Sequence, residues 1–179
     1  MKKVLIPTVV ILMAALYFGC AKKKEVIEFD VAYSTDLAIP TLTTGVTYTF
    51  TSPDVMTAIG EKLASNGTNA DRVGEVYYKD FSLAVKTPSA GNVGFIKWTK
   101  FFINAVKQPE QQVAWRYNEG SYTISPTAKS TTLRLNEPNL KNRFMENSVY
   151  FKYYLESLTA TSPMTLTAMH TIHVKAISE

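Results

Sequence analysis

Cysteine, histidine, glycine and proline are scarce in this chain of 179 residues, which contains one Cys, two His, eight Gly and eight Pro. A single Cys forms no intramolecular disulfide, and a zinc site usually needs three or four converging ligands. The few Gly and Pro exclude collagen-like and low-complexity chains. The sequence also lacks a G-x-S-x-G turn and a glycine-rich phosphate loop. It therefore predicts no metal, no cofactor and no enzyme of the common hydrolase or nucleotide-binding classes.

The sequence has no hydrophobic run long enough to cross a membrane as a helix. Residues 4–18 form a run of 15 largely apolar residues, whereas a spanning helix needs about 20. Lys2 and Lys3 precede this run, and a basic start followed by a short apolar stretch is typical of a cleaved signal peptide. We therefore expect residues 1–19 to be removed, which leaves 179 minus 19, or 160, residues in one domain.

Excess charge of one sign is missing from the predicted domain. The chain carries 19 Lys and Arg against 15 Asp and Glu, but two Lys lie in the predicted signal peptide and three more at positions 22–24. Residues 25–179 therefore hold 19 minus 5, or 14, basic and 15 acidic residues, a net charge of −1. Without a basic field, the attraction to phosphates that underlies nucleic-acid binding is missing. Nucleic acid is not an expected partner.

The residues at the end of the apolar run resemble the lipobox of bacterial lipoproteins. In that family a small residue precedes a cysteine that receives a diacylglycerol and becomes the new N-terminus, and Gly19 and Cys20 fit this pattern. In that family the third position before the cysteine is usually Leu. Here Tyr17 occupies that position, and the Leu lies one residue earlier, at Leu16. The resemblance implies that Leu16 and Gly19 direct signal cleavage and that Cys20 is lipidated. Residues 20–25 would then be a lipidated cysteine and a basic tether.

The lipid and the lysines after it predict a protein anchored in the bacterial cell envelope. Each buried acyl methylene contributes about 0.8 kcal/mol, so the two or three chains of a lipoprotein hold it on the membrane. Lys22, Lys23 and Lys24 would lie against anionic headgroups, each adding about 1 kcal/mol. Surface-exported lipoproteins carry acidic residues after the cysteine, so the resemblance implies the periplasmic face of the outer membrane. The alternative is a soluble secreted protein in which Cys20 is an incidental free thiol.

Alternating apolar and polar residues predict an all-β domain at residues 26–179. In residues 44–51, for example, Val46, Tyr48 and Phe50 alternate with Thr, which is typical of a half-buried strand. About eight strands without alternating helices favour an immunoglobulin-like antiparallel two-sheet sandwich, and a closed β-barrel is the alternative. The expected strands are residues 25–33, 44–51, 73–86, 98–106, 111–117, 131–135, 149–156 and 165–176.

Three local departures from strand alternation are also predicted. Apolar residues recur at helical spacing within residues 53–65, where we expect one short helix. A single helical turn is expected within residues 138–145. In the third expected strand the apolar positions change from even to odd numbers near Lys79 and Asp80, which predicts a bulge there.

The few candidate catalytic side chains do not form a recognisable site. His170 and His173 stand three apart on an expected strand, so their side chains point to opposite faces and cannot share a metal. We expect His170 in the core or at an edge, with its polar atoms satisfied, and His173 in solvent. Glu28 and Asp30 share one strand face, which could suit a glycosidase but is also the ordinary composition of an exposed face. The sequence therefore predicts a protein that is not an enzyme.

Aromatic side chains are the one feature of the sequence that indicates a binding surface. Trp98, Trp115 and Tyr117 belong to neighbouring expected strands, and Tyr150 and Tyr154 fall on the polar side of theirs. Trp and Tyr dominate recognition hot spots and also stack on sugars, so these five residues are the candidate contacts for a ligand or partner. On a β-sandwich such aromatics also form cross-strand pairs that only stabilise the sheet.

Three stretches of the domain resemble a group of small bacterial envelope lipoproteins with a β-sandwich domain. They are residues 69–87 (NADRVGEVYYKDFSLAVKT), 95–105 (FIKWTKFFINA) and 133–174. The resemblance implies the fold and the compartment, and it carries over no functional residues because the group has no established activity. With the lipobox, it leads us to expect a membrane-anchored, non-catalytic scaffold or protein-binding subunit of the envelope. The alternative is a glycan-binding module that uses exposed Trp and Tyr residues.

Overall fold

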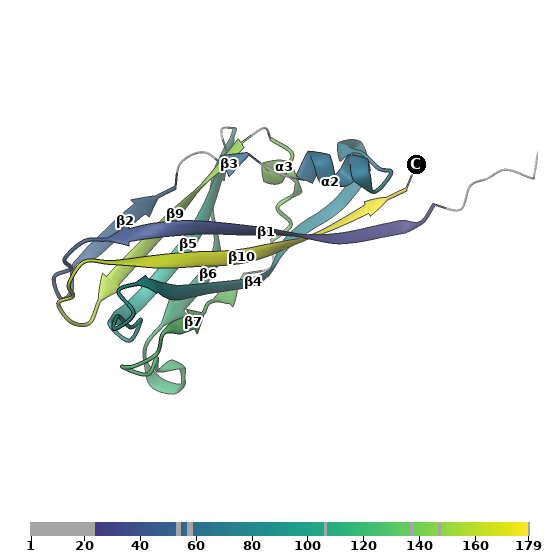
Figure 1. Cartoon of the computed structure of the whole chain (residues 1–179). Helices are drawn as coiled ribbons and strands as arrows, with labels where there is room; N and C mark the ends of the chain where they lie inside the picture. The colour runs from purple at the N-terminus through teal and green to yellow at the C-terminus, as the bar shows by residue number, and fades with distance from the viewer. Residues whose placement is uncertain are drawn as a thin grey trace, which may run out of the picture.

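The computed structural model describes residues 24–52, 55–56, 59–105, 107–136, 138–146 and 148–178. Within these ranges ten strands form two antiparallel sheets that pack face to face (Figure 1). The predicted antiparallel two-sheet sandwich is confirmed, and the described strands do not close into a barrel. None of the described helices is long and apolar enough to span a membrane. The predicted signal peptide with Leu16 and Gly19, the predicted lipidation site Cys20 and residues 21–23 lie outside the described residues.

One sheet has four strands in the order β1-β10-β4-β7. The first residue of β1 lies opposite the last residue of β10, and the two strands, of 14 residues each, pair along their whole length. The beginning and the end of the described chain therefore lie side by side at one end of the domain (Figure 1). The four strands are β1 (Val26–Ile39), β10 (Met164–Ile177), β4 (Val73–Thr87) and β7 (Ser130–Thr132).

The other sheet has six strands, five of them in the order β2-β9-β5-β6-β8, with β3 also paired to β9. In β9, and in β5 from Trp98 onward, odd-numbered residues such as Phe101, Phe151 and Tyr153 are buried against the four-stranded sheet. The even-numbered residues of these stretches therefore point to the outer side. At the start of β5 a register shift reverses this order, so Ile96 is buried and Lys97 is exposed. The six strands are β2 (Thr47–Thr51), β3 (Val55–Met56), β5 (Ile96–Ala105), β6 (Gln108–Tyr117), β8 (Arg134–Leu135) and β9 (Ser148–Ser157).

The helix predicted at residues 53–65 is shorter than expected. β3 pairs Val55 with Val149 of β9, and the helix α2 (Ile59–Ser65) begins only after it. Pairing with β9 satisfies backbone groups of Val55 that a helix would otherwise have to satisfy, and a β-branched residue suits a strand. Ile59 and Leu63, one helical turn apart, are both buried, as the helical spacing predicted. The predicted turn at residues 138–145 contains the short helix α3 (Lys141–Phe144).

The strand predicted at residues 131–135 is divided between the two sheets. Thr131 pairs with Leu83 of β4, whereas Leu135 pairs with Ala114 of β6. The buried Leu133 lies between β7 and β8, where the chain passes from one sheet to the other. The alternation of apolar residues continues through this crossing, so the sequence pattern alone could not reveal it.

β4 carries the bulge predicted near Lys79 and Asp80. Asp80 lies opposite Thr171 of β10 and Tyr78 lies opposite Ile172, so Lys79 is the extra residue. The bulge changes the buried positions of β4 from even to odd numbers. Apolar side chains therefore point into the core on both sides of it.

His170 lies in the core, as predicted, and is 1% exposed. It stands in one cross-strand row between Tyr33 of β1 and Phe81 of β4. The imidazole stacks on both rings, with centroids 5.4 Å from Tyr33 and 5.3 Å from Phe81. The expectation that its polar atoms are satisfied was wrong, because neither ring nitrogen has a hydrogen-bond partner within the described part of the chain. Burial lowers the pKa of His170 to about 3, because charging it would bring an ion into the apolar core.

The buried imidazole should make stability depend on pH. The unfolded chain binds a proton at His170 with the usual pKa of 6.5, whereas the folded chain does so only near pH 3. Above pH 6.5 His170 has no effect, and between pH 6.5 and 3 it lowers the free energy of unfolding, by about 5 kcal/mol at the acid end. His170→Phe, which can occupy the same stack, should flatten this dependence in denaturant unfolding. If NMR showed that the His170 imidazole titrates near pH 6.5 in the folded protein, this explanation would be contradicted.

Candidate functional site

The five aromatic residues predicted as contacts all lie on the outer face of the six-stranded sheet. Residues paired across neighbouring strands share a face, and β5 pairs Trp98 with Tyr117 of β6. It also pairs Lys100 with Trp115 on one side and with Tyr154 on the other. All five aromatic residues are partly exposed. With two cations among them they form what we call the aromatic face: Trp98, Trp115, Tyr117, Tyr150, Tyr154, Lys100 and Arg134.

A carboxylate fixes the position of Trp98 on this face. The indole Nε1 donates to Glu156 Oε2 at 2.7 Å, and the Lys97 ammonium donates to the other oxygen at 2.6 Å. These donors, Lys97 first and Trp98 second, lower the pKa of Glu156 below its usual value. The Glu156 side chain is therefore charged at neutral pH, and the indole is oriented before any partner arrives.

Two cations lie over the rings of the aromatic face. The Lys100 ammonium is 5.3 Å from the centroid of Trp98, and the Arg134 guanidinium is 5.4 Å from that of Trp115. Arg134 also lies 3.7 Å from the centroid of Tyr122, whose side chain is exposed beside the sheet. Cation–π contacts of this kind contribute about 0.5–1 kcal/mol when exposed. They hold long charged side chains flat against the rings instead of leaving them free in solvent.

The charge of the aromatic face is positive where it surrounds Trp115. Neither Lys100 nor Arg134 forms an ion pair with a carboxylate of the described residues. Further along the sheet, Lys152 lies 3.4 Å from Glu110, which also accepts a hydrogen bond from the Tyr154 hydroxyl at 3.4 Å. The face therefore keeps two cations uncompensated at one end and a neutral pair at the other.

The rings of the aromatic face do not form a flat platform. Trp115 and Tyr117 have centroids 5.3 Å apart but planes inclined by 59°, and Phe102 and Tyr154 meet at 77°. A sugar ring stacks best on aromatic faces that it can cover in parallel. The inclined rings instead present edges as well as faces to the solvent.

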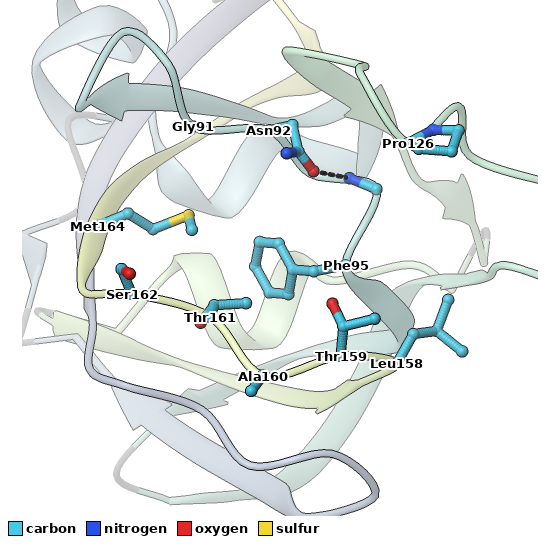
Figure 2. A pocket seen from close by; sticks show the side chains of 11 residues that line it. Gly91, Asn92, Phe95, Pro126, Leu158, Thr159, Ala160, Thr161, Ser162 and Met164 are labelled. Carbon is cyan, nitrogen blue, oxygen red and sulfur yellow. Dashed lines mark hydrogen bonds between the residues drawn. The ribbon is translucent and has the colours of Figure 1, made fainter.

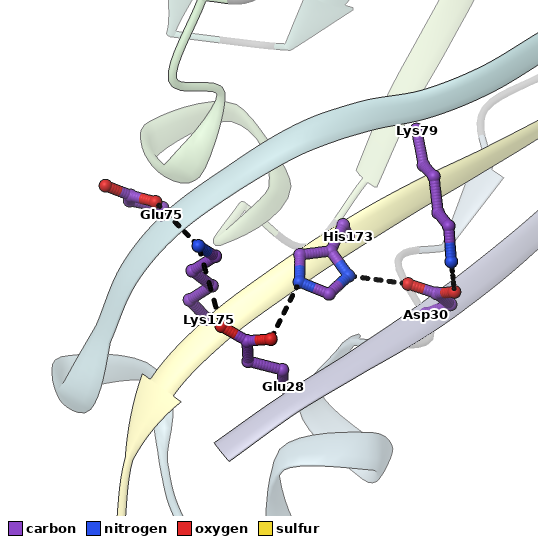
Figure 3. A network of polar contacts seen from close by, with 6 residues as sticks. All are labelled: Glu28, Asp30, Glu75, Lys79, His173 and Lys175. Atoms are coloured by element: carbon purple, nitrogen blue, oxygen red, sulfur yellow. Dashed lines mark hydrogen bonds and ion pairs between the residues drawn. The ribbon is translucent and has the colours of Figure 1, made fainter. Parts of the chain in front are cut away.

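The outer face of the four-stranded sheet carries the acidic pair that could have suited a glycosidase. Asp30 receives hydrogen bonds from Lys79 at 2.6 Å, and its other oxygen is 2.7 Å from His173 Nδ1 (Figure 3). Lys79 and then His173 lower the pKa of Asp30, whereas an acid catalyst needs a raised one. Glu28 lies 3.5 Å from Lys175. Glu28 and Asp30 therefore tie β1 to the neighbouring strands and do not form an acid and base pair.

His173 differs from the prediction that it lies in solvent. Its side chain is on the outer face, as expected, but only 15% exposed. The imidazole packs against Tyr77 with centroids 5.1 Å apart and lies between Asp30 and Glu28, with Nε2 3.6 Å from the Glu28 carboxylate. His170 faces the core on the same strand, so the two histidines are on opposite sides, as predicted. Within the described residues no three His, Cys, Asp or Glu side chains gather where a metal could bind.

A cleft of about 510 Å³ adjoins this charged network on the same sheet. Its lining includes Asn139, whose side-chain oxygen accepts from the Val76 amide at 3.2 Å and whose nitrogen donates to Gly74 at 3.1 Å. Lys175, also in the lining, is held by Glu28 and by Glu75 at 3.9 Å. The polar groups of this cleft already serve the fold, so it offers little to a ligand.

A second cleft, of about 460 Å³, lies at the end of the domain away from the first residue of β1 (Figures 1 and 2). None of its lining residues is charged. Phe95 lies at its base, and Asn92 closes one wall by accepting a hydrogen bond from the Gly94 amide at 3.0 Å (Figure 2). The sequence could not reveal this cleft, because its two walls, residues 91–95 and residues 158–162, come from loops far apart in the chain.

Gly94 is required by the packing of this end of the domain. A Cβ atom at Gly94 would lie 2.5 Å from Pro126 Cα and 2.7 Å from the Ser125 carbonyl oxygen, both in backbone that cannot move aside cheaply. We expect Gly94→Ala to lower the free energy of unfolding by about 1–3 kcal/mol in chemical denaturation. Gly60→Ala is the matched control, because nothing lies within 4 Å of its Cβ position in α2. It should raise stability by up to about 1 kcal/mol. Equal effects of the two substitutions would contradict the packing assigned to Gly94.

Comparison with known proteins gives a distant structural match. No protein-family model and no curated protein matches this chain. Among solved structures, it is similar to the chain described as "Crystal structure of decameric BFDV Capsid Protein". That match has a TM-score of 0.41 and 10% sequence identity, and it covers 85% of this chain and 99% of that chain. A similarity of this size carries no inference about function.

Proposed function

We propose that this protein is a lipid-anchored β-sandwich of the bacterial cell envelope, a non-catalytic subunit that binds a partner protein through the aromatic face. The register of β5 with β6 and β9 is the observation that carries the proposal, because it brings two Trp, three Tyr and two cations to one exposed surface. Trp, Tyr and Arg are the residues that dominate the hot spots of protein interfaces. On this sheet they are arranged together while the core is filled by other side chains.

The partner that fits this surface presents carboxylates beside an apolar patch. Lys100 and Arg134 are available to pair with such carboxylates, because their charged groups lie over aromatic rings and form no ion pair within the described residues. The partly exposed rings of Trp115 and Tyr117 lie next to them and supply the area that must be removed from water. Charge complementarity at the rim of an interface mainly increases the rate of association and selects the partner.

The anchor keeps the domain close to the membrane. Cys20 would carry the lipid, and β1 begins at Val26, six residues later. Even a fully extended chain of that length reaches only about 20 Å. A partner must therefore itself be part of, or very near, the envelope, which supports a role as a subunit of an envelope assembly.

The glycan-binding alternative would use the same Trp and Tyr residues. Neither Trp98 nor Trp115 is buried, so both could in principle meet a sugar. Cations lie over both indoles, however, and the neighbouring rings are inclined. These two observations favour a protein partner over a polysaccharide.

Lipidation should depend on the single cysteine. In cells that express the full chain, metabolic labelling with a palmitate analogue should mark the protein, and Cys20→Ser should remove the label. Tyr17→Leu, which places Leu where the lipobox family has it, should keep the label and speed signal cleavage in a pulse-chase experiment. Label that persists in Cys20→Ser would contradict the anchor.

The aromatic face should cross-link to a specific envelope protein. A photo-reactive phenylalanine analogue in place of Tyr117 should give one reproducible adduct in intact envelopes. The same analogue in place of Met169, which is 44% exposed on the other sheet, should not give that adduct.

Trp115→Ala should weaken the association about 10- to 100-fold, as expected for a hot-spot residue. Arg134→Glu should also abolish the adduct without changing the melting temperature by more than a few degrees.

An adduct that forms equally from Tyr117 and Met169, or one that survives Arg134→Glu, would contradict the proposed face. A saturable change in Trp fluorescence with purified cell-wall fragments would favour the glycan alternative instead.

A further inference from the structure

β1 is an edge strand of unusual length with one side unpaired. Within the described part of the chain β10 is the only strand that pairs with it. The 14 pairs between them follow without a register shift. Proteins normally protect such edges with Pro, Lys or bulges, or keep them short. Val26–Ile39 contains no Pro, Lys or Arg, and spans about 45 Å.

The register shows which backbone groups face the free side. The Ser178 amide donates to the Glu25 carbonyl at 2.8 Å, so Glu25 directs its backbone groups toward β10. Successive residues of a strand point to alternate sides, and the pairing has no irregularity. The even-numbered residues from Val26 to Ala38 therefore direct their N–H and C=O groups away from β10. These groups form a regular ladder of donors and acceptors along the free edge.

Ion pairs hold this edge in place. Asp30 is bonded to Lys79 of β4, across the intervening β10 (Figure 3). Asp36 is bonded in the same way to Lys86 of β4 and accepts a hydrogen bond from the Thr167 hydroxyl at 2.9 Å. Because β1 is already ordered, little of its own conformational entropy is lost when another strand pairs with it.

The side chains at the edge define what can be added there. On the outer face β1 contributes only acidic charges, at Glu28, Asp30 and Asp36, and each already forms an ion pair with a Lys of β4 or β10. Their side chains remain 48%, 38% and 45% exposed, so each carboxylate can accept a further cation. On the inner face Phe29 and Tyr33 are only partly buried, although both pack against the core. An added strand would therefore be favoured by cations at its outward positions and apolar side chains at its inward positions.

Only some registers of a second copy at this edge are disfavoured. Antiparallel pairing of two β1 strands about Ala32 places Glu28 of one copy opposite Asp36 of the other, and like charges directly opposite each other destabilise a strand pair. Pairing about Ser34 places Asp30 opposite Ala38 and Asp36 opposite Ala32, without that repulsion. A dimer through β1 is therefore an outcome that the test must separate from the binding of a basic segment.

We propose that β1 binds an extended segment of a partner protein by strand addition, and that this segment alternates Lys or Arg with apolar residues. Main-chain hydrogen bonds to the even-numbered residues supply the affinity, and the acidic row with Phe29 and Tyr33 supplies the selectivity. This site lies on the edge of the four-stranded sheet and is independent of the aromatic face. Either surface could bind its partner without the other.

The test uses the full chain in detergent and a fluorescent peptide of sequence Lys-Val-Lys-Thr-Lys-Val-Lys, with a peptide carrying Glu in place of each Lys as the control. Saturable anisotropy is expected with the basic peptide and at least ten-fold weaker binding with the acidic one. Hydrogen exchange should then show new protection at the amides of Ala32 and Ser34, while the odd-numbered amides of β1 are protected already. Equal binding of the two peptides, or protection elsewhere, would overturn the proposal.

Ala32→Pro tests the backbone contact directly. It removes one amide that faces the free edge and leaves those that bond to β10 in place, and Pro is tolerated on edge strands. Peptide affinity should fall at least ten-fold, whereas Ala32→Thr, which keeps the amide, should bind like the original chain. Ala38→Pro is a second variant at the same edge should the first fail to fold. Unchanged affinity in a folded Pro variant, or a concentration-dependent dimer that Ala32→Pro dissociates, would overturn the proposal.

Discussion

Packing of aromatic side chains between the two sheets is the constraint on which the rest of the structure depends. Phe81 of β4 and Phe101 of β5 meet across the interior with centroids 4.4 Å apart, and Tyr153 of β9 lies 4.9 Å from Phe101. Because side chains alternate along a strand, committing odd-numbered residues of β5 and β9 to the core directs the even-numbered ones outward. The aromatic face is thus a consequence of the core register. If the register of β5 slipped by one residue, Phe102 would take the inward position of Phe101. Both the core packing and the aromatic face would then be lost.

Strand alternation predicted the face that several residues occupy, although not that of Tyr78, which was expected opposite the apolar row of its strand and is 2% exposed. It placed the Lys79 bulge and the core position of His170, and it put Tyr150 and Tyr154 on the outer side of β9. The features that were missed depend on pairing between distant segments. The partners of His173 come from β1 and β4, and the cleft at the end of the domain joins loops about 65 residues apart. No local sequence pattern encodes contacts between distant segments. Neither the strand order nor the free edge of β1 could therefore be predicted from the sequence.

The same limit applies to the candidate site. The residue types of the aromatic face were evident in the sequence, but their convergence required β5 to lie between β6 and β9. The contribution of Lys100 and Arg134 was not foreseen, because cations over rings follow from register and side-chain direction together. These two residues change the interpretation of the surface, since they make it positive and cover the indoles that a sugar would need.

The two proposed surfaces differ in chemistry and in position. The aromatic face is broad, partly apolar and positive around Trp115, whereas the β1 edge is narrow, carries acidic side chains paired with Lys and offers chiefly backbone groups. They lie on different sheets, so if Cys20 anchors the domain as proposed, it could contact two segments of an envelope assembly at once. Such a division suits a protein whose role is to hold others in place.

The most direct test of the central claim is hydroxyl-radical footprinting of the chain in intact envelopes and after purification, followed by mass spectrometry. If a partner protein covers the aromatic face, Trp115 and Tyr117 should be oxidised several-fold less in the envelope than in the purified chain. Met169, exposed on the other sheet, should be oxidised equally in both samples. Equal oxidation of Trp115 and Tyr117 in the two samples would show that the aromatic face is uncovered in the envelope and would contradict the proposed function.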